Sequence, residues 1–167
     1  MEAPPAFSRV ISYGKYEGTL ASAIHYFKFL GIRRLSLPLS ELLFSVIPDD
    51  IDTIVPVPLS LGSLRSRGFN QALLLARHLS KKRKSRLMMD VLRKVIDTPP
   101  QVGLSARERA ANVKKAFACT GTVDDMNILL IDDVVTTGAT VNACSKQLLR
   151  AGAKSVQVLT LARAGEE

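Results

Sequence analysis

Cysteine is scarce in this sequence, which limits the stabilising and metal sites that it can form. Only Cys119 and Cys144 occur in 167 residues. Two cysteines this far apart make neither a disulfide framework nor a zinc site. We interpret both as buried or incidental thiols, with Cys144 on a helix, and expect no metal site built from cysteine.

Long apolar runs are also missing. The stretches LLLA at 73–76 and ILLI at 128–131 are far shorter than the roughly 20 residues that a membrane-spanning helix needs. The N-terminal stretch MEAPPAFSRVISYG has an early Glu2, two prolines and no apolar core of signal-peptide length. We therefore expect a cytoplasmic protein without membrane insertion. Internal repeats and low-complexity linkers are absent as well.

The composition that is present suits one well-buried domain over residues 1–167, because 47% of the residues are hydrophobic. The formal net charge of +8 and a pI near 9.8 predict affinity for polyanions. Nucleic acid and phosphorylated small molecules both fit that charge, which does not choose between them.

Apolar periodicity predicts alternating helices and strands after a helical N-terminal part over residues 1–50. The stretch DTIVPVP predicts a buried strand, LSLGSLRSRG a loop, and NQALLLARHLSKK a helix that Asn70 caps. Further strands are expected at MMDVLRKVID, ILLI and SVQVLTLA, with helices over 104–117 and from Val141 to Leu148. This alternation predicts an α/β fold with a mostly parallel central sheet flanked by helices.

The stretch ILLIDDVVTTGAT, residues 128–140, joins an apolar strand to two carboxylates and then to hydroxyls around one glycine. Ligands of parallel sheets sit outside the carboxyl ends of the strands, where we expect Asp132 and Asp133 to emerge. Backbone N–H groups of the turn and the following helix, with the threonine hydroxyls, would hold a phosphate group, and Gly138 would let the backbone approach it. Carboxylates accept hydrogen bonds from ribose hydroxyls or partner a metal that the ligand carries. The pattern predicts a ribose 5-phosphate unit as the ligand.

Other nucleotide-binding motifs fit this stretch less well. A Walker A loop would end in GK[ST], and a dinucleotide fingerprint would need several spaced glycines. Arg65 and Arg67, in the expected loop after the first buried strand, could reach a pyrophosphate in forked geometry, and a solvated basic loop is the equal alternative. His25 and His78 lack a spaced partner, so we assign neither a metal nor a base.

The stretch IDDVVTTGAT resembles the phosphoribosyl pyrophosphate (PRPP) binding motif of the type I phosphoribosyltransferases. The segments YGKYEGTLASAIHYFKFLGIRR, VPVPLSLGSLRSRGFNQ and TPPQVGLSARERAANVKKAF extend the resemblance to the ComF family of competence-associated phosphoribosyltransferase-like proteins. The resemblance implies a type I phosphoribosyltransferase fold that binds PRPP, with Mg²⁺ held through the ligand. It implies ribose contacts from Asp132 and Asp133; phosphate contacts from Val135, Thr136, Thr137, Gly138, Ala139 and Thr140; pyrophosphate contacts from Leu59, Ser60, Arg65 and Arg67; and a mobile cover with Arg107, Arg109 and Asn112.

Two functions stay open at this point. One is transfer of a 5-phosphoribosyl group from PRPP with loss of pyrophosphate. The other is a protein that senses PRPP or a nucleotide, or handles single-stranded DNA or DNA-uptake proteins, because no general base is apparent and a fold does not establish catalysis. Many ComF relatives begin with a cysteine-rich segment, and this chain starts where that segment would end. The acceptor and the oligomeric state are left open.

Overall fold

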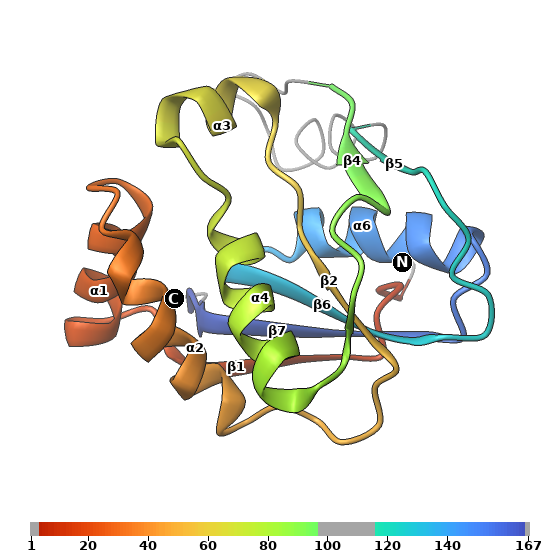
Figure 1. Ribbon diagram of the computed structural model, residues 1–167, viewed down its shortest axis with the longest axis horizontal. Coiled ribbons are helices and arrows are strands. Elements are labelled where there is room, and N and C mark those ends of the chain that lie inside the picture. The colour runs from red at the N-terminus through yellow and green to blue at the C-terminus, as the bar shows by residue number, and fades with distance from the viewer. Residues whose placement is uncertain (1–3, 97–115, 166–167) are drawn as a thin grey trace.

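The computed structural model describes residues 4–96 and 116–165, in which a five-stranded sheet forms the centre (Figure 1). The strand order is β1-β7-β6-β2-β3, and every neighbouring pair is parallel. The strands are β1 (Arg9–Lys15), β2 (Thr53–Pro56), β3 (Arg86–Leu87), β6 (Asn127–Val135) and β7 (Ser155–Arg163). The predicted α/β class with a parallel sheet is confirmed, and β6 is its central strand.

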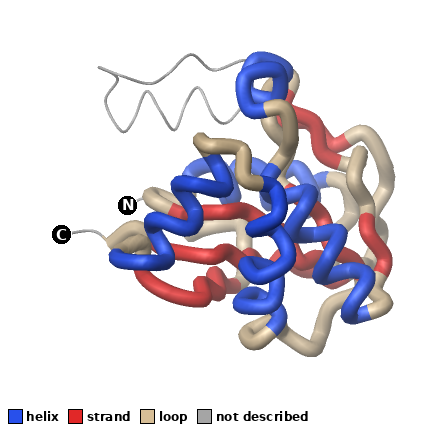
Figure 2. Tube along the Cα trace, turned by 60° about the vertical axis from the view of Figure 1, so that its left-hand side comes forward, coloured by secondary structure: helices blue, strands red, loops and turns tan. Residues whose placement is uncertain are grey.

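Helices cover both faces of the sheet, as Figure 2 shows with the strands in red between helices in blue. One face packs against α1 (Gly18–Lys28), α2 (Ser36–Phe44) and α4 (Gln71–Arg83), and the short 3-10 turn η1 (Arg33–Leu35) precedes α2. The other face packs against α6 (Ala139–Arg150). Helices α1 and α2 thus lie within the N-terminal part predicted to be helical, and the helix predicted after Asn70 is present as α4.

Strand β6 reads as a continuous apolar run because both of its faces are buried. Leu129 and Ile131 pack with the α1, α2 and α4 side, whereas Ile128 and Leu130 pack with the α6 side. All four side chains are fully buried. A parallel strand covered by helices on both faces has this pattern, and its carboxyl end then opens at the edge of the sheet.

Two strands differ from the sequence-based expectation. Residues 9–15 lie in the part expected to be helical, yet they form the edge strand β1 on β7, where the Ser12 and Thr160 hydroxyls lie 2.9 Å apart. The strand expected at MMDVLRKVID is only β4 (Leu92–Lys94), and it does not join the parallel sheet. It pairs antiparallel with β5 (Phe117–Cys119) in a separate two-stranded sheet that packs against α6.

Within residues 4–96 and 116–165, none of the helices combines the length and the apolar character needed to cross a membrane. The helix predicted over 104–117 falls almost wholly outside the described residues, and at its end Phe117 belongs to β5.

Candidate functional site

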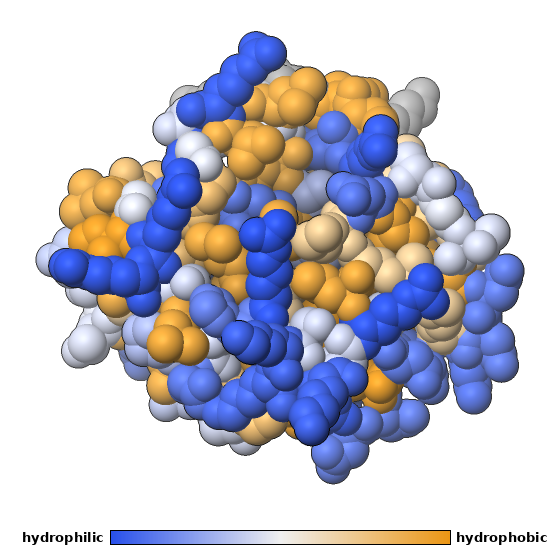
Figure 3. Space-filling view, in the orientation of Figure 1, coloured by the Kyte–Doolittle hydropathy of each residue, from blue (hydrophilic) through white to orange (hydrophobic). Residues whose placement is uncertain are grey.

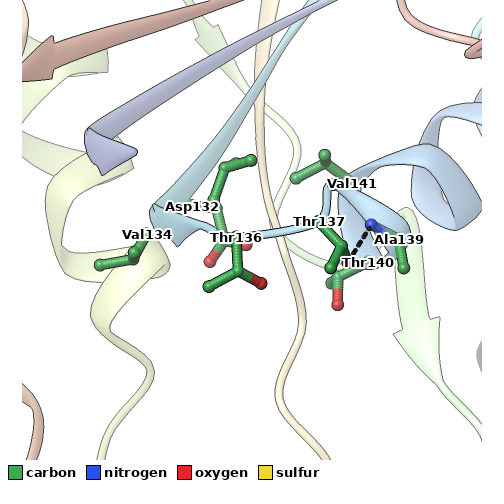
Figure 4. Close-up of a pocket in the computed structure, with 9 residues that line it drawn as sticks. Asp132, Val134, Thr136, Thr137, Ala139, Thr140 and Val141 are labelled. Atoms are coloured by element: carbon green, nitrogen blue, oxygen red, sulfur yellow. Dashed lines mark hydrogen bonds between the residues drawn. The ribbon is translucent and has the colours of Figure 1, made fainter. Parts of the chain in front are cut away.

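The loop between β6 and α6 lies at the carboxyl edge of the sheet and forms a pocket (Figure 4). Asp132 and the segment from Val134 to Val141 line it, which includes all six residues predicted to bind phosphate. Strand β6 continues to Val135, so Asp132 and Asp133 lie within the strand and not beyond its tip as the sequence suggested. The pocket therefore extends from the last residues of β6 to the first turn of α6.

The start of α6 carries donors without a side-chain cap. Gly138 is the N-cap residue and makes no side-chain cap hydrogen bond, and the Thr137 hydroxyl accepts the Ala139 N–H over a long 3.4 Å. The first N–H groups of a helix have no partner inside it, and they carry the positive end of its dipole. Figure 4 shows Thr137 and Thr140 at this helix start, with Thr136 nearer the end of the strand beside Asp132. The loop is thus suited to bind an anion such as phosphate.

Gly138 is needed at this position for its backbone conformation. Its φ of +77° lies in the left-handed region, which side chains with a β-carbon adopt only at a cost of roughly 1–2 kcal/mol. A β-carbon here would meet only the Phe7 ring, at 3.9 Å. The steric reason is therefore the sharp turn into α6, and not crowding of the protein around the glycine.

The two aspartates make different contacts. Asp133 is 6% exposed, and its two carboxylate oxygens each lie 2.9 Å from the Lys28 ammonium nitrogen of α1. It also accepts the Val134 N–H at 2.7 Å. Asp132 lines the pocket instead, and one of its oxygens accepts the Asp133 N–H at 2.9 Å. Figure 4 shows the Asp132 carboxylate on the same side of the strand end as Thr136. Only Asp132 therefore faces the space beside the phosphate loop.

Burial, followed by the negative charge of Asp133, raises the pKa of Asp132, which lies at about 7 once all influences are combined. The Asp133 N–H that Asp132 accepts, together with the positive charges of Lys28 and Arg67, limits the rise in this pKa. Asp132 thus changes its charge near neutral pH. Perturbed carboxyl groups of this kind are common where a protein binds a ligand or catalyses a reaction.

The segment predicted as a pyrophosphate loop is partly helical. After Val57–Leu59 the chain forms α3 (Leu61–Arg67), because the Ser60 hydroxyl accepts the Ser63 N–H at 3.1 Å and Gly68 ends the helix at a φ of +73°. Ser60 is buried and already serves as this cap, and Leu59 is half-buried beside it. The loop prediction was wrong over residues 61–67.

The two predicted arginines are placed differently by α3. The Arg67 guanidinium lies over the Phe29 ring with 5.6 Å to its centroid, and its Nη1 donates to Gln71 Oε1 at 3.4 Å. It is close enough to lower the pKa of Asp132. Arg65 lies exposed on the same helix. The structure therefore brings Arg67, together with Lys28, to the carboxylates.

Lys28 and Gln71 were absent from the sequence-based site. A lysine at the end of an amphipathic helix carries no motif, because such residues are usually solvated. Gln71 had a weak signal, as a polar residue among the apolar positions of QALLLA, and it is buried. Buried polar side chains need hydrogen-bond partners, so its position pointed to a network.

Three of the predicted site residues cannot be located in the structure. Arg107, Arg109 and Asn112 lie outside the described residues. Among the residues that the structure describes, no three His, Cys, Asp or Glu side chains gather in a way that could hold a metal ion. His78 lies 3.1 Å from the Ser36 hydroxyl, and His25 packs against Phe29.

The parallel sheet and its helix-flanked loop define a type I phosphoribosyltransferase fold. A family model described as "Phosphoribosyl transferase domain" matches residues 24–167. The structure superimposes with a TM-score of 0.57 on the glutamine PRPP amidotransferase from B. subtilis complexed with ADP and GMP, at 15% identity over 82% of this chain and 30% of that one. This likeness is one of fold.

Curated relatives show to which family of phosphoribosyltransferase-domain proteins the chain belongs. Competence protein F of Haemophilus influenzae is 34% identical over an alignment of 171 residues, gaps included. The alignment covers 96% of this chain and 75% of the relative. The DNA utilization protein YhgH of Escherichia coli K12 is also 34% identical and covers 98% and 75%. Competence protein ComFC of Bacillus subtilis is 33% identical over 89% of this chain, which spans 61% of that relative. The chain belongs to this ComF family of phosphoribosyltransferase-domain proteins.

Proposed function

We propose that this protein binds PRPP at the carboxyl edge of its sheet and transfers the 5-phosphoribosyl group with release of pyrophosphate. The observation that carries the proposal is the pocket that joins Asp132 to the start of α6, where Gly138 supplies no side-chain cap; a raised pKa such as that of Asp132 is common among functional carboxyl groups. Membership of a phosphoribosyltransferase-domain family supports the same ligand.

In this proposal, different residues would bind the 5-phosphate, the ribose and the pyrophosphate of PRPP. The loop from Thr136 to Thr140 would receive the 5-phosphate through backbone N–H groups and hydroxyls. Asp132 would accept hydrogen bonds from the ribose hydroxyl groups, and Arg67 would approach the pyrophosphate from α3. Loss of pyrophosphate leaves positive charge on the ribose, so the main task of the protein is to hold the donor in line with its acceptor and to stabilise the leaving group.

Magnesium would bind as part of the ligand. Mg²⁺ is usually bound through substrate phosphates, water and one or two carboxylates, so the protein need not supply a cluster of metal ligands. Bound in this way it would neutralise charge on the departing pyrophosphate. The residues named above would bind and orient the ribose 5-phosphate part.

Arginine substitutions in α3 test the proposal by calorimetry with PRPP and Mg²⁺. Arg67→Ala should weaken PRPP binding roughly tenfold or more, because a hydrogen bond to a charged group contributes about 1.5–3 kcal/mol. The matched control Arg65→Ala removes the same charge from the same helix at an exposed position and should change the affinity less than about threefold. Equal losses in the two variants would exclude a specific role for Arg67. A wild-type protein that does not bind PRPP would exclude the function.

A second candidate function is the handling of single-stranded DNA in competence. The printed names of the relatives, competence protein and DNA utilization protein, favour such a role. The basic run at 81–86 extends from the end of α4 to the start of β3, and Figure 3 shows hydrophilic side chains gathered near this end of α4. Two of its charges are already paired, Lys82 with Glu41 and Arg83 with Asp49. The exposed charges that remain could still contact a phosphate backbone.

Salt dependence separates this second function from PRPP binding. If the run at 81–86 binds single-stranded DNA, the logarithm of the affinity should fall with the logarithm of salt concentration at a slope of about 0.7 per phosphate contact. Substituting Lys81, Lys84 and Arg86 by Gln should flatten that slope, whereas Arg67→Ala should leave it unchanged. Fluorescence anisotropy with a labelled oligonucleotide, with and without PRPP, provides the measurement. A slope that the Gln substitutions do not change would rule out this surface.

A further inference from the structure

Lys28 connects the N-terminal helix to the candidate site. It is the last residue of α1, and its ammonium group reaches Asp133 of β6 with 2.9 Å to each carboxylate oxygen. The lysine side chain is 22% exposed, and Asp133 is nearly buried. An ion pair shielded from water in this way is screened less by salt than a surface pair, and its geometry is more restricted.

The backbone of Lys28 is held by a second contact. Gln71 of α4, which is 2% exposed, donates from Nε2 to the Lys28 carbonyl oxygen at 3.4 Å. Its Oε1 accepts from Arg67 of α3 at 3.4 Å. A buried amide therefore joins the end of α1 to the arginine that we place at the pyrophosphate. Lys28 is therefore held by contacts with both β6 and α4.

The ion pair separates the tasks of the two carboxylates. Adjacent residues of a strand point to opposite faces, so Asp133 lies toward α1 while Asp132 lines the pocket. Without its lysine, Asp133 would be a buried and unpaired negative charge next to Asp132. Two nearby carboxylates without a counter-charge do not both stay ionised.

We propose that Lys28 is a positioning residue of the phosphoribosyl site: its ammonium group neutralises Asp133 on the α1 side of β6, so that Asp132 meets the ribose as an ionised carboxylate. This inference rests on the proposed function, because it names the residue that prepares Asp132 for its ligand. Lys28 acts through Asp133 and not by touching the ligand.

The charged groups around Asp132 set its pKa, so the pH dependence of PRPP binding can test the role of Lys28. Asp133 of β6 raises the pKa of Asp132, whereas Lys28 of α1 and Arg67 of α3 lower it. On the α6 side, burial, the charge of Asp132 and a smaller opposing effect of Lys94 from β4 leave the Cys144 thiol with a raised pKa, so that it stays uncharged near neutral pH. Removing Lys28 should therefore raise the pKa of Asp132 above its value of about 7 and move PRPP binding to higher pH.

The experiment measures PRPP affinity by calorimetry between pH 6 and pH 9 for three single variants. Lys28→Met should bind more weakly at pH 7, by roughly fivefold if the pKa of Asp132 rises by about one unit, because its ionised fraction falls from about one half to about one tenth, and the pH midpoint should shift upward. Lys28→Arg should restore both, since a guanidinium also pairs with a carboxylate. The control Lys82→Met removes a lysine from the exposed pair with Glu41 and should leave both unchanged. An unshifted midpoint in Lys28→Met would overturn the proposal.

A double variant keeps the test decisive if Lys28→Met folds poorly. Lys28→Met with Asp133→Asn removes both charges, so Asp132 no longer has an unpaired carboxylate beside it, and most of the lost affinity should return. If the double variant bound as weakly as Lys28→Met, Lys28 would contact the ligand itself and the positioning role would be wrong. Absence of PRPP binding in the wild-type protein would instead reject the proposed function, and this inference with it.

Discussion

Asp132→Asn is expected to weaken PRPP binding at least tenfold and, at the same time, to raise the melting temperature at neutral pH. The loss of affinity follows from removing the carboxylate that accepts the ribose hydroxyls, a charge-assisted contact that contributes about 1.5–3 kcal/mol. The gain in stability follows from the pKa of Asp132, which is raised from 3.8 to about 7 in the folded protein. The folded state therefore carries this carboxylate at a cost, which an amide avoids.

The stabilisation by Asp132→Asn should increase with pH. Between pH 4 and pH 7 the folded protein holds a proton on Asp132 that the unfolded chain has released, so the stability of the wild type falls as pH rises through this window. Asn does not titrate, so the stabilisation by Asp132→Asn should be small near pH 4 and largest above pH 7. Thermal unfolding at pH 5 and pH 8 measures it, at roughly 2–4 °C for each kcal/mol. A melting temperature that does not respond to pH in this way would contradict the raised pKa, and unchanged PRPP affinity would remove Asp132 from the site.

The neighbouring substitution Asp133→Asn should have the opposite effect on stability. It breaks the pair with Lys28 and leaves an ammonium group largely enclosed by protein, which costs about 3 kcal/mol, at the low end for buried pairs because Lys28 is partly exposed. Urea unfolding measures the loss. Glu41→Gln provides the matched control, because it breaks the exposed pair with Lys82 and should cost less than about 1 kcal/mol. Equal losses in the two variants would mean that the Lys28–Asp133 pair is no more than a surface contact.

The different expectations for two adjacent aspartates show what the sequence could and could not predict. The motif predicted both as equivalent ribose ligands beyond the carboxyl end of a strand. Strand alternation alone places neighbouring residues on opposite faces, so their separation could have been predicted once β6 was known to extend to Val135. The partner of Asp133 could not, because Lys28 is 105 residues away and comes to it only through the packing of α1 on the sheet.

Local signals explain most of the elements that were predicted correctly. Asn70 caps α4 by accepting the Leu73 N–H at 3.2 Å, as its position before an apolar helical pattern suggested. Ser60 and Gly68 likewise cap the two ends of α3. Both residues are typical helix caps, although the prediction for this segment was a loop. The edge strand β1 gave a weaker signal, because RVISYGK has no apolar run and one side of it lacks a partner strand. Pairing of β4 with β5 joins residues far apart in the chain, which periodicity cannot predict.

The position of β1 also determines where this domain can be divided. The phosphoribosyl transferase domain match begins at residue 24, after β1 has ended, yet β1 pairs with β7 through register partners from Arg9 to Lys15. Contacts continue upstream, where the Ala6 N–H donates to the Asn142 side chain at 2.8 Å. A protein expressed from residue 24 would expose the backbone edge of β7, whose side chains are mostly apolar and buried, and such an edge is prone to pair with other chains. A unit that keeps this edge of β7 covered therefore includes β1 and the contact that Ala6 makes with Asn142.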